Sequence, residues 1–508
     1  MHAALAEFTP ERVEKIVGID AATIRRVAIE LCDAPRAAVY GRIGTTTVSF
    51  GTTASWLVDV LNVVTGNLDI VGGAMFPLPV ASSPTTRGKK GVGKGFKTGR
   101  GKTRVRGFPE SLGEYPAALM AEEIETPGEG QIRAMVVVGG NPVLSTPNSD
   151  QLARALDSLE FMVSVDIYLN ETSRHADVVL PAPSHLYRSH YDLALLNFGL
   201  RSVANYSEPV FELPAGVPDE WEILAKLAAI AQGLGASADP ATVDEVTIRS
   251  MIDSTVRDDT CVIAGRDAEE IYDALSGPAN CSLRGPDRIL DLLLRIGPFG
   301  DGFGANPDGV SVAALKRNPH GIDYGAMVPR VPEALRTPSG KIELAPAPLM
   351  ADLPRLRDSL RADPDAMLLV GRRHLRSNNS WMHNIKVLVK GKPRCTLHIH
   401  PDDAARLGVV DGSPVRVTSR VGSVVAPAEI TDAIRPRVVS LPHGWGHSMR
   451  GTRMTVAQEH AGVNSNVLTD HEAIDPLSGN AVLNGIPVEL ERGDSRTPGV
   501  TDSRVAVS

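Results

Sequence analysis

Cysteine is scarce in this sequence. Its 508 residues include only Cys32, Cys261, Cys281 and Cys395, and no two of them form a C-x-x-C pair. So few and so scattered thiols argue against a disulfide scaffold. They also argue against a cysteine-ligated iron–sulfur cluster or a structural zinc site within the sequence. We therefore expect four buried or unreactive thiols.

Aromatic residues and positive charge are also in short supply. Aromatics make up 4% of the sequence, and the net charge is −8. Few aromatics disfavour a protein that stacks bases, and an acidic balance disfavours a nucleic-acid partner. No segment approaches the roughly 18 apolar residues of a membrane span. Because residues 1–35 also lack the basic start and unbroken apolar core of a secretory signal, we expect a cytoplasmic location.

What the sequence does contain is an α/β pattern in its first part. Hydrophobic residues reach 43%, and the length suits about three domains. Helices are predicted to begin after Thr9 and Asp20 and to cover 54–68 and 149–159, and apolar strands are predicted at 36–44, 134–142, 161–166 and 176–181. This alternation predicts a doubly wound parallel sheet. Ligands of such sheets bind beyond the carboxyl ends of the strands, where Asn141 and Asp166 fall.

The pattern changes after residue 365. A stretch rich in Pro and Asp at 346–365 predicts a linker, and 366–492 contains short strands separated by Gly and Pro turns. This texture predicts a separate β-barrel domain. The polar residues 493–508 are typical of a flexible tail.

One segment, Gly88–Gly107, consists almost entirely of glycine and positive charge. Gly88 to Lys94 fits G-x-x-x-x-G-K, but Gly95 stands where a phosphate-binding loop needs Ser or Thr. The segment also lacks the preceding strand and the following helix of that motif. Locally it is typical of a mobile surface loop.

Several stretches together resemble the molybdopterin oxidoreductases, which include formate dehydrogenases, nitrate reductases and dimethyl sulfoxide reductases. They follow the family's order and span nearly the whole sequence. In chain order they are "LNVVTGNLDIVGGAMF", "VVVGGNPVLSTPN", "FMVSVDIYLNETSRHADVVLPAPS", "TPSGKIEL", "LRSNNSWMHN", "IHPDDAARLGVVDGSPVRV", "SLPHGWGH" and "GVNSNVLTDHEAIDPLSG".

The resemblance implies a division of the chain. A partial Rossmann-like α/β domain would cover 1–80, and a second α/β domain with the basic loop 88–107 would cover 81–345. The linker 346–365 would lead to a molybdopterin dinucleotide-binding domain at 366–492, a six-stranded type of β-barrel, and then to the tail. We hypothesise that the basic loop lies over an anionic cofactor or substrate path.

The resemblance also implies a molybdenum or tungsten bis(molybdopterin guanine dinucleotide) cofactor and the two-electron redox of a small substrate. Such a ligand needs amides for pterin edges, carboxylates for guanine donors and N–H groups for phosphates. The residues that match the family's cofactor contacts are Asn141, Asp166, Thr172, Asp177, Arg188, Asp219, Arg372, His374, Arg376, Ser377, Asn378, Asn379, His443, Trp445, His447, Asn464, Asn466 and Asn484.

Some of these residues also have a simple structural interpretation. Asn141 could be a turn residue before proline, and Asp166 and Asp219 could cap helices. Asp177 could end a turn. The spacing of His443, Trp445 and His447 matches no common zinc motif. No catalytic residue is predicted.

Two parts of the family pattern are not found in this sequence. These are the four-cysteine segment for a [4Fe–4S] cluster and the stretch that supplies the metal's protein ligand. We therefore expect the chain to correspond to the C-terminal two-thirds of such an enzyme, with any cluster in an upstream segment or a partner chain. The alternatives are a non-catalytic cofactor-binding subunit served by an iron–sulfur or electron-acceptor subunit, a relative without molybdenum, like the large iron–sulfur subunit of respiratory complex I, and an inactive fragment of a longer gene product.

Overall fold

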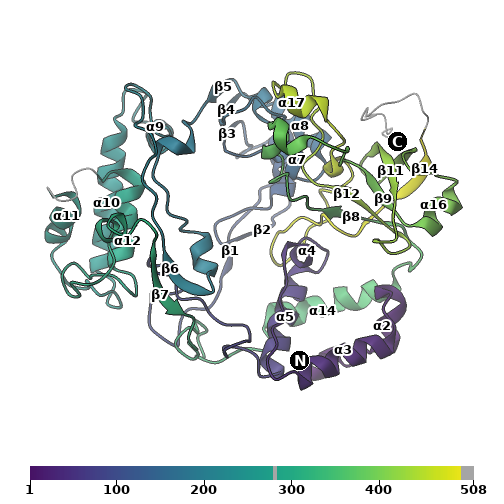
Figure 1. Ribbon diagram of the computed structural model, residues 1–508, viewed down its shortest axis with the longest axis horizontal. Coiled ribbons are helices and arrows are strands. Elements are labelled where there is room, and N and C mark those ends of the chain that lie inside the picture. Colours follow the sequence, from purple (N-terminus) through teal and green to yellow (C-terminus); the bar gives the residue numbers. More distant parts are fainter. Residues whose placement is uncertain (278–282, 494–508) are drawn as a thin grey trace.

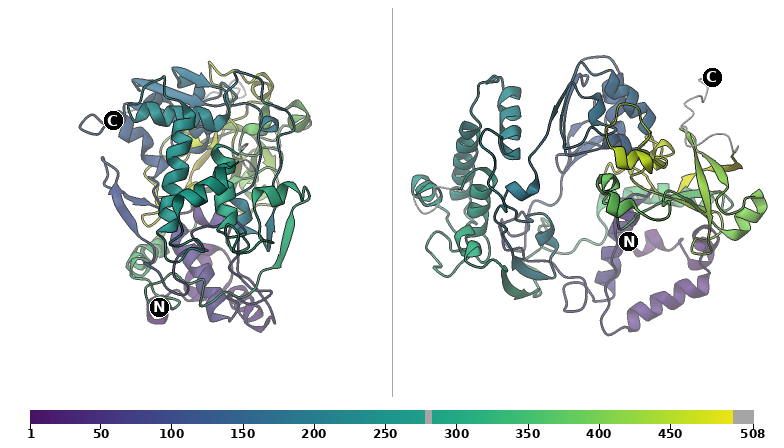
Figure 2. Two further views of the ribbon diagram at one scale, coloured as in Figure 1. Left: turned by 90° about the vertical axis from the view of Figure 1, so that its left-hand side faces the viewer. Right: turned by 45° about the horizontal axis from the view of Figure 1, so that its top comes forward.

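The computed structural model describes residues 1–277 and 283–493. Figure 1 shows four regions: the N-terminal helices with α14, a small parallel sheet, a lobe of helices α9–α12, and a C-terminal sheet. The right-hand view of Figure 2 separates the helical lobe from the C-terminal sheet. The predicted fold class, α/β with a parallel sheet and a C-terminal β domain, is confirmed.

The N-terminal region is helical, as predicted. Asp20 caps its second long helix, because its Oδ1 accepts from the N–H of Thr23 at 2.8 Å, whereas the Thr9 side chain makes no capping hydrogen bond. The helices are α1 (His2–Leu5), α2 (Pro10–Val17), α3 (Ala21–Asp33), α4 (Ile43–Thr46) and α5 (Gly51–Val64).

The apolar stretch 36–44 is not the predicted strand. Its backbone pairs with a side chain: Asn62 of α5 donates from Nδ2 to the carbonyl of Val39 at 2.9 Å and accepts from the N–H of Val39 at 2.9 Å. A buried amide on a helix thus satisfies the groups that a neighbouring strand would have satisfied.

The predicted linker 346–365 is mostly a packed helix. Helix α14 (Ala347–Asp358) lies against α5, where Leu353 joins Trp56 and Val60 in one buried cluster. Arg355 of α14 also donates to the carbonyl of Ser49 at 2.6 Å. The stretch therefore ties the N-terminal helices to the rest of the chain.

Three parallel strands form the small sheet, in the order β3 (Ala134–Val138), β4 (Phe161–Val165), β5 (Val178–Leu180). Helices α6 (Met120–Glu125) and α8 (Ser149–Asp157) cover one face and bury Ile124, Leu156 and Val137. The residue in the N-cap position of α8 is Asn148. On the other face Val136 and Phe161 remain 54% and 48% exposed, so α6 and α8 cover only one side.

The helical lobe has its own core, which includes Ile248, Ile271 and Leu292. Its helices are α9 (Glu220–Ala231), α10 (Pro240–Val256), α11 (Ala268–Ser276), α12 (Gly285–Arg295) and α13 (Val312–Lys316), beside a two-stranded antiparallel sheet of β6 (Arg201–Ala204) and β7 (Ile322–Ala326).

The C-terminal domain is a mixed sheet that curls into a half-barrel. Seven strands run in the order β13-β8-β12-β9-β11-β10-β14, one more than the six expected. Val415 and Val417 are fully buried, as their alternation predicts. The strands are β8 (Leu368–Arg372), β9 (Leu397–Ile399), β10 (Pro414–Thr418), β11 (Ser423–Ile430), β12 (Val438–Pro442), β13 (Ile486–Pro487) and β14 (Glu489–Arg492); the helices are α15 (Lys386–Val389), α16 (Pro401–Leu407) and α17 (Thr455–Glu459).

The basic segment 88–107 is anchored in the fold. Its first part follows the backbone of 333–337: the N–H groups of Gly91, Gly93 and Gly95 donate to carbonyls there at 2.9–3.1 Å. A Cβ on Gly93 would lie 2.5 Å from the Arg336 carbonyl oxygen, so glycine permits this close approach. The second part forms a hairpin of β1 (Thr98–Lys102) with β2 (Pro109–Ser111). Its role toward an anionic ligand stays a prediction.

Candidate functional site at the seam between the parallel sheet and the C-terminal domain

Asn141 lies just beyond the carboxyl end of β3, as predicted. Its Nδ2 donates to Glu171 Oε2 at 2.8 Å, and its Oδ1 accepts from Thr172 Oγ1 at 2.8 Å. Thr172 is fully buried and also accepts from the N–H of Val143 at 3.1 Å. Two residues of the loop after β4 thus set the orientation of the Asn141 amide.

Asp166 follows β4 and is only 3% exposed. Its carboxylate accepts from the N–H of Tyr168 at 3.0 Å and from Asn170 Nδ2 at 2.9 Å, and burial raises its pKa. It therefore holds its own loop in shape. Asp177 lies at the opposite edge, before β5, where it accepts from the N–H of Met162 at 2.8 Å, so the structure does not bring it to the strand-end site.

A chain of buried hydrogen bonds leads from this site into the C-terminal domain. His447 Nδ1 lies 3.0 Å from Glu171 Oε1, His383 Nδ1 lies 2.8 Å from His447 Nε2, and Ser377 Oγ lies 2.8 Å from His383 Nε2. None of these four side chains is more than 3% exposed. The chain joins predicted residues to Glu171 and His383, which were not predicted.

Trp445 packs on this chain. Its ring stacks on His383 with centroids 4.0 Å apart, and its buried Nε1 has no hydrogen-bond partner. Gly444 has a φ of +88°, and a Cβ there would lie 1.9 Å from the carbonyl oxygen of Asn379. Only glycine therefore lets the Gly444–His447 turn approach the loop that carries Ser377, Asn378 and Asn379.

Asn464 and Asn466 fasten the C-terminal domain to α7 (Pro142–Ser145), the turn after Asn141. Asn464 Nδ2 donates to the carbonyl of Val143 at 3.0 Å, and Asn466 Nδ2 donates to the carbonyl of Leu144 at 2.7 Å. Both side chains are buried. Their contacts place the loops of the C-terminal domain over the strand ends.

A cavity of 170 Å³ lies on the same seam. It brings together three predicted residues, His443, Asn466 and Asn484. Asn484 donates to Thr47 Oγ1 at 2.7 Å and accepts from the N–H of Gly371 at 2.9 Å. Burial and the neighbouring Arg373 lower the pKa of His443 to about 4, so its ring is a neutral donor and acceptor. Its lining is Ile43, Gly44, Thr47, Leu369, Gly371, Arg373, His443, Ser465, Asn466, Thr469, Leu483 and Asn484.

Arg373, rather than the predicted Arg372, lines this cavity. Arg372 points into the sheet, where it donates to the carbonyls of Ser440 at 2.6 Å and Thr396 at 2.8 Å. The difference follows from strand periodicity, since Arg372 is the last residue of β8, Arg373 follows it directly, and successive residues of an extended chain face opposite sides. Arg373 also donates to Asn379 Oδ1.

The remaining predicted residues of this loop differ in exposure. His374 Nδ1 accepts from the N–H of Arg376 at 3.2 Å, and burial lowers the pKa of His374. Arg376, Asn378 and Asn379 are exposed, and both asparagines have positive φ angles. Their donors are thus free to meet a ligand.

Arg188 and Asp219 lie apart from the seam, on a second cavity of 440 Å³ beside α9. Arg188 forms an ion pair with Glu220. Asp219 caps α9 and forms a capping box with Glu222, as its structural interpretation had suggested, and burial raises its pKa. Asp287 lines the same cavity.

Comparison with known families accounts for both sides of the seam. Residues 9–229 match the family model of the molybdopterin oxidoreductases, and residues 367–487 match that of the molydopterin dinucleotide binding domain. The chain thus carries a molybdopterin oxidoreductase region and a molydopterin dinucleotide binding domain. The description of the second region names dinucleotide binding, and both regions contribute residues to the seam cavity.

Among curated molybdopterin oxidoreductases, the chain is 26% identical over 499 residues to the F420-dependent formate dehydrogenase subunit alpha of Methanocaldococcus jannaschii, covering 96% of this chain and 63% of that protein. It is 23% identical to the dimethyl sulfoxide/trimethylamine N-oxide reductase of Rhodobacter capsulatus, covering 86% and 52%. The chain thus spans between about half and two-thirds of the length of these relatives.

The fold agrees with a solved structure. Acetylene hydratase from Pelobacter acetylenicus superposes with a TM-score of 0.64 at 18% identity, covering 97% of this chain and 66% of that one. At this identity the likeness supports the fold alone.

The donor set at the seam fits the molybdopterin dinucleotide cofactor of this family. Side-chain amides, an exposed guanidinium and glycines line the cavity, and the Trp445 N–H is a buried donor without a partner. Within residues 1–277 and 283–493, no cluster of three or more His, Cys, Asp or Glu side chains could hold a metal ion by itself. In the same ranges no helix has the length and apolarity needed to cross a bilayer.

Three residues of the seam were missed: Glu171, His383 and Arg373. Glu171 directly precedes Thr172, and His383 lies in the stretch that includes Ser377. A buried acid and a buried histidine cannot be told from surface ones by spacing, because their partners come from segments far away in the sequence. Glu171 and His447, for example, are 276 positions apart.

Proposed function

We propose that this chain forms the dinucleotide-binding shell of a molybdopterin-dependent oxidoreductase that carries out the two-electron redox of a small substrate. One observation carries the proposal. One cavity is lined by Gly44 and Thr47 from the molybdopterin oxidoreductase region and by Arg373, His443 and Asn484 from the dinucleotide-binding region. A ligand that needs both domains fits between them.

The roles of the residues follow from their chemistry. The Asn466 and Asn484 amides suit pterin or guanine edges, and Arg373 suits a phosphate, because a guanidinium donates in a fixed fork. The neutral ring of His443 offers one donor and one acceptor. When bound, the metal of a molybdenum or tungsten bis(molybdopterin guanine dinucleotide) cofactor supplies the redox chemistry; this chain's residues bind and orient the cofactor and exclude water.

The cavity that contains Arg188 and Asp219 is a second candidate contact for the same cofactor. The carboxylates of Asp219 and Asp287 could accept from guanine N–H groups, and Arg188 could contact a phosphate. The Arg188–Glu220 ion pair would then be exchanged for an ion pair with the ligand. Four further predicted contacts would not touch the cofactor directly but would hold the seam in shape: Asn141, Thr172, Ser377 and His447.

The substrate and partners are inferred from the relatives. Their names specify formate, dimethyl sulfoxide and trimethylamine N-oxide, so we infer a small molecule of this class. The formate dehydrogenase relative is a subunit, which supports an iron–sulfur or electron-acceptor partner chain for this protein. We also propose the domain boundaries given above, with 346–365 as a packed connecting helix, and a cytoplasmic location.

The first experiment is to isolate the protein from its own cells, denature it, and measure released guanine nucleotide together with molybdenum and tungsten. We expect guanine nucleotide and one of the two metals. Arg373→Ala should lower both amounts, whereas Arg406→Ala, which changes an exposed arginine on α16, should leave them unchanged. Protein free of guanine nucleotide would favour a relative without molybdenum. Cofactor-loaded protein that is inactive toward formate, nitrate and sulfoxides, alone or with partners, would favour a non-catalytic cofactor-binding subunit.

A further inference from the structure

The buried chain at the seam is continuous from one domain to the other. Ser377, His383, His447 and Glu171 are linked by contacts of 2.8, 2.8 and 3.0 Å, and Glu171 continues at 2.8 Å to Asn141 at the strand ends. All contacts are direct, between side chains. The first two residues of the chain come from the segment after β8, the third follows β12, and the fourth follows β4.

The directions of these hydrogen bonds can be worked out from Glu171. An ionised carboxylate only accepts, so His447 Nδ1 carries a hydrogen. In a neutral His447 ring Nε2 then accepts, so His383 Nδ1 donates. His383 Nε2 is left as an acceptor for the Ser377 hydroxyl. Every hydrogen bond therefore points from Ser377 toward Glu171.

We propose that Ser377, His383, His447 and Glu171 form a proton-transfer path that loads one proton onto the His447–Glu171 pair beside Asn141. Histidine suits this task, because an imidazole can take a proton on one nitrogen and release one from the other. Ser377 is the entry. It is itself 3% exposed, but it lies in a loop whose neighbours Arg376 and Asn378 are exposed to solvent.

The transfer balances without any electron change. A solvent proton bonds to Ser377 Oγ as the hydroxyl hydrogen passes to His383 Nε2. The N–H bond at His383 Nδ1 breaks as its hydrogen bonds to His447 Nε2. His447 becomes an imidazolium facing the Glu171 carboxylate, or it passes its Nδ1 hydrogen to Glu171 Oε1. After the transfer, His383 donates to Ser377 and accepts from His447, so both of its hydrogen bonds have reversed direction. The nitrogen and oxygen atoms do not move.

The surroundings favour storage at His447 rather than at His383. Burial first, and then the neighbouring His447, His374 and Arg394 side chains, lower the pKa of His383 to about 3. His383 thus stays neutral between transfers, whereas His447 faces a carboxylate. A purely structural bridge would need no ionisable groups, and burying them is costly unless they are paired.

The purpose of the path rests on the proposed function, because redox of a small substrate consumes or releases protons with its electrons. The path itself can be tested without turnover. Histidine-selective ¹⁵N NMR of the isolated protein, from about pH 5 to about pH 9, reports the protonation and tautomer of each ring. We expect the signals of His383 and His447 to change together, as a coupled pair, because one proton reverses both.

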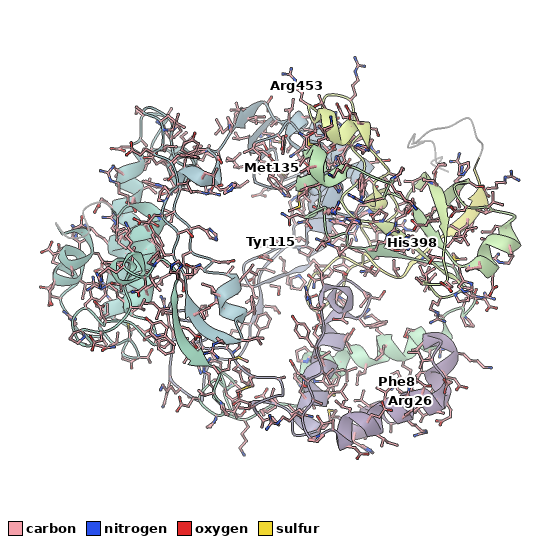
Figure 3. All side chains as sticks on the ribbon, in the orientation of Figure 1. Phe8, Arg26, Tyr115, Met135, His398 and Arg453 are labelled. Atoms are coloured by element: carbon pink, nitrogen blue, oxygen red, sulfur yellow. The ribbon has the colours of Figure 1, made fainter. Side chains whose placement is uncertain are left out.

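Variants separate the path from a fixed bridge. His383→Gln keeps a donor and an acceptor but cannot relay a proton, so the coupled change in the two ring signals should be lost. Ser377→Ala is a milder change and should slow proton exchange of the pair by about tenfold or more. His398→Gln is the matched control. His398 is a residue of β9, and its Nε2 lies 3.3 Å from Glu429. Figure 3 shows His398 on the C-terminal sheet, set apart from Met135 of β3.

Two results would overturn the proposal. One is that both rings keep a single tautomer and protonation state across the whole pH range. The other is that Ser377→Ala leaves the exchange rate unchanged. Protein that contains no guanine nucleotide would count against the proposed function alone, since the NMR result does not depend on a bound cofactor.

Discussion

His447 Nδ1 lies 3.0 Å from Glu171 Oε1, and both side chains are completely buried. This contact joins the dinucleotide-binding region to the loop that follows β4 of the parallel sheet. Glu171 also accepts from Asn141, so one carboxylate orients residues of both domains. Substitution of Glu171 should therefore affect both sides of the seam.

Glu171→Ala should therefore destabilise the protein strongly. It leaves the His447 ring and the Asn141 amide without their acceptor in a dry environment, and breaking a buried pair costs about 3–5 kcal/mol. The loss can be measured by urea unfolding. Glu429→Ala, which removes an exposed partner of His398, should cost at most about 1 kcal/mol. Equal losses in the two variants would contradict this account of the seam.

Arg372 and Arg373 should respond differently to substitution by alanine. Arg372→Ala removes the guanidinium that donates to the Ser440 and Thr396 carbonyls and should cost about 1–3 kcal/mol of stability. Arg373→Ala should leave stability nearly unchanged and reduce the guanine nucleotide released on denaturation. Thermal unfolding and nucleotide analysis of both variants check this, and the reverse assignment would show that Arg372 is the ligand contact.

Gly444→Ala should disrupt the turn that packs on the Ser377 loop. The new Cβ would lie 1.9 Å from the Asn379 carbonyl oxygen at a φ of +88°, so either the turn or the loop must move. Gly412→Ala is the control, because its φ is +77° but no atom lies within 4 Å. The control carries only backbone strain of about 1–2 kcal/mol. We expect a clearly larger fall in melting temperature for Gly444→Ala.

Stability should decrease on acidification. The folded-state pKa values of His383 and His443 are lowered to about 3 and about 4, mainly by burial, from an ordinary value of 6.5. Below about pH 6.5 the unfolded chain binds protons that the folded chain does not, so stability is lost as the pH falls toward those values and is unaffected above. At about pH 5 each histidine lowers the free energy of unfolding by up to about 2 kcal/mol relative to neutral pH. Urea midpoints at about pH 7 and about pH 5 measure the change, and His443→Gln should reduce it.

Thiol chemistry should distinguish two cysteines. Burial raises the pKa of the Cys395 thiol to about 11, whereas Cys32 is exposed on α3. Because the thiolate is the reactive form, an alkylating reagent near neutral pH should label Cys32 and leave Cys395 unlabelled in the folded protein. Peptide mass analysis checks the outcome. Rapid labelling of Cys395 would mean that the C-terminal core opens readily.

Local patterns predicted the elements that depend on short-range order. The alternation of Val415 and Val417, the cap at Asp20 and the apolar strand before Asn141 all act within a few residues. The predicted strand at 36–44 does not form, because its backbone partner comes from a different part of the chain. Its partner is the Asn62 side chain, which only the packing of α5 supplies.

The sequence by itself thus indicated the family and the fold class, and it predicted that Asn141 lies at the carboxyl end of a strand. Short motifs carry that information, because a strand end or a glycine turn is specified locally. Only the tertiary structure decided that Arg373 rather than Arg372 lines the cavity, and that Glu171, His383 and His447 form one buried chain. These depend on side-chain direction and on contacts between distant segments, and burial then sets the charge of each group.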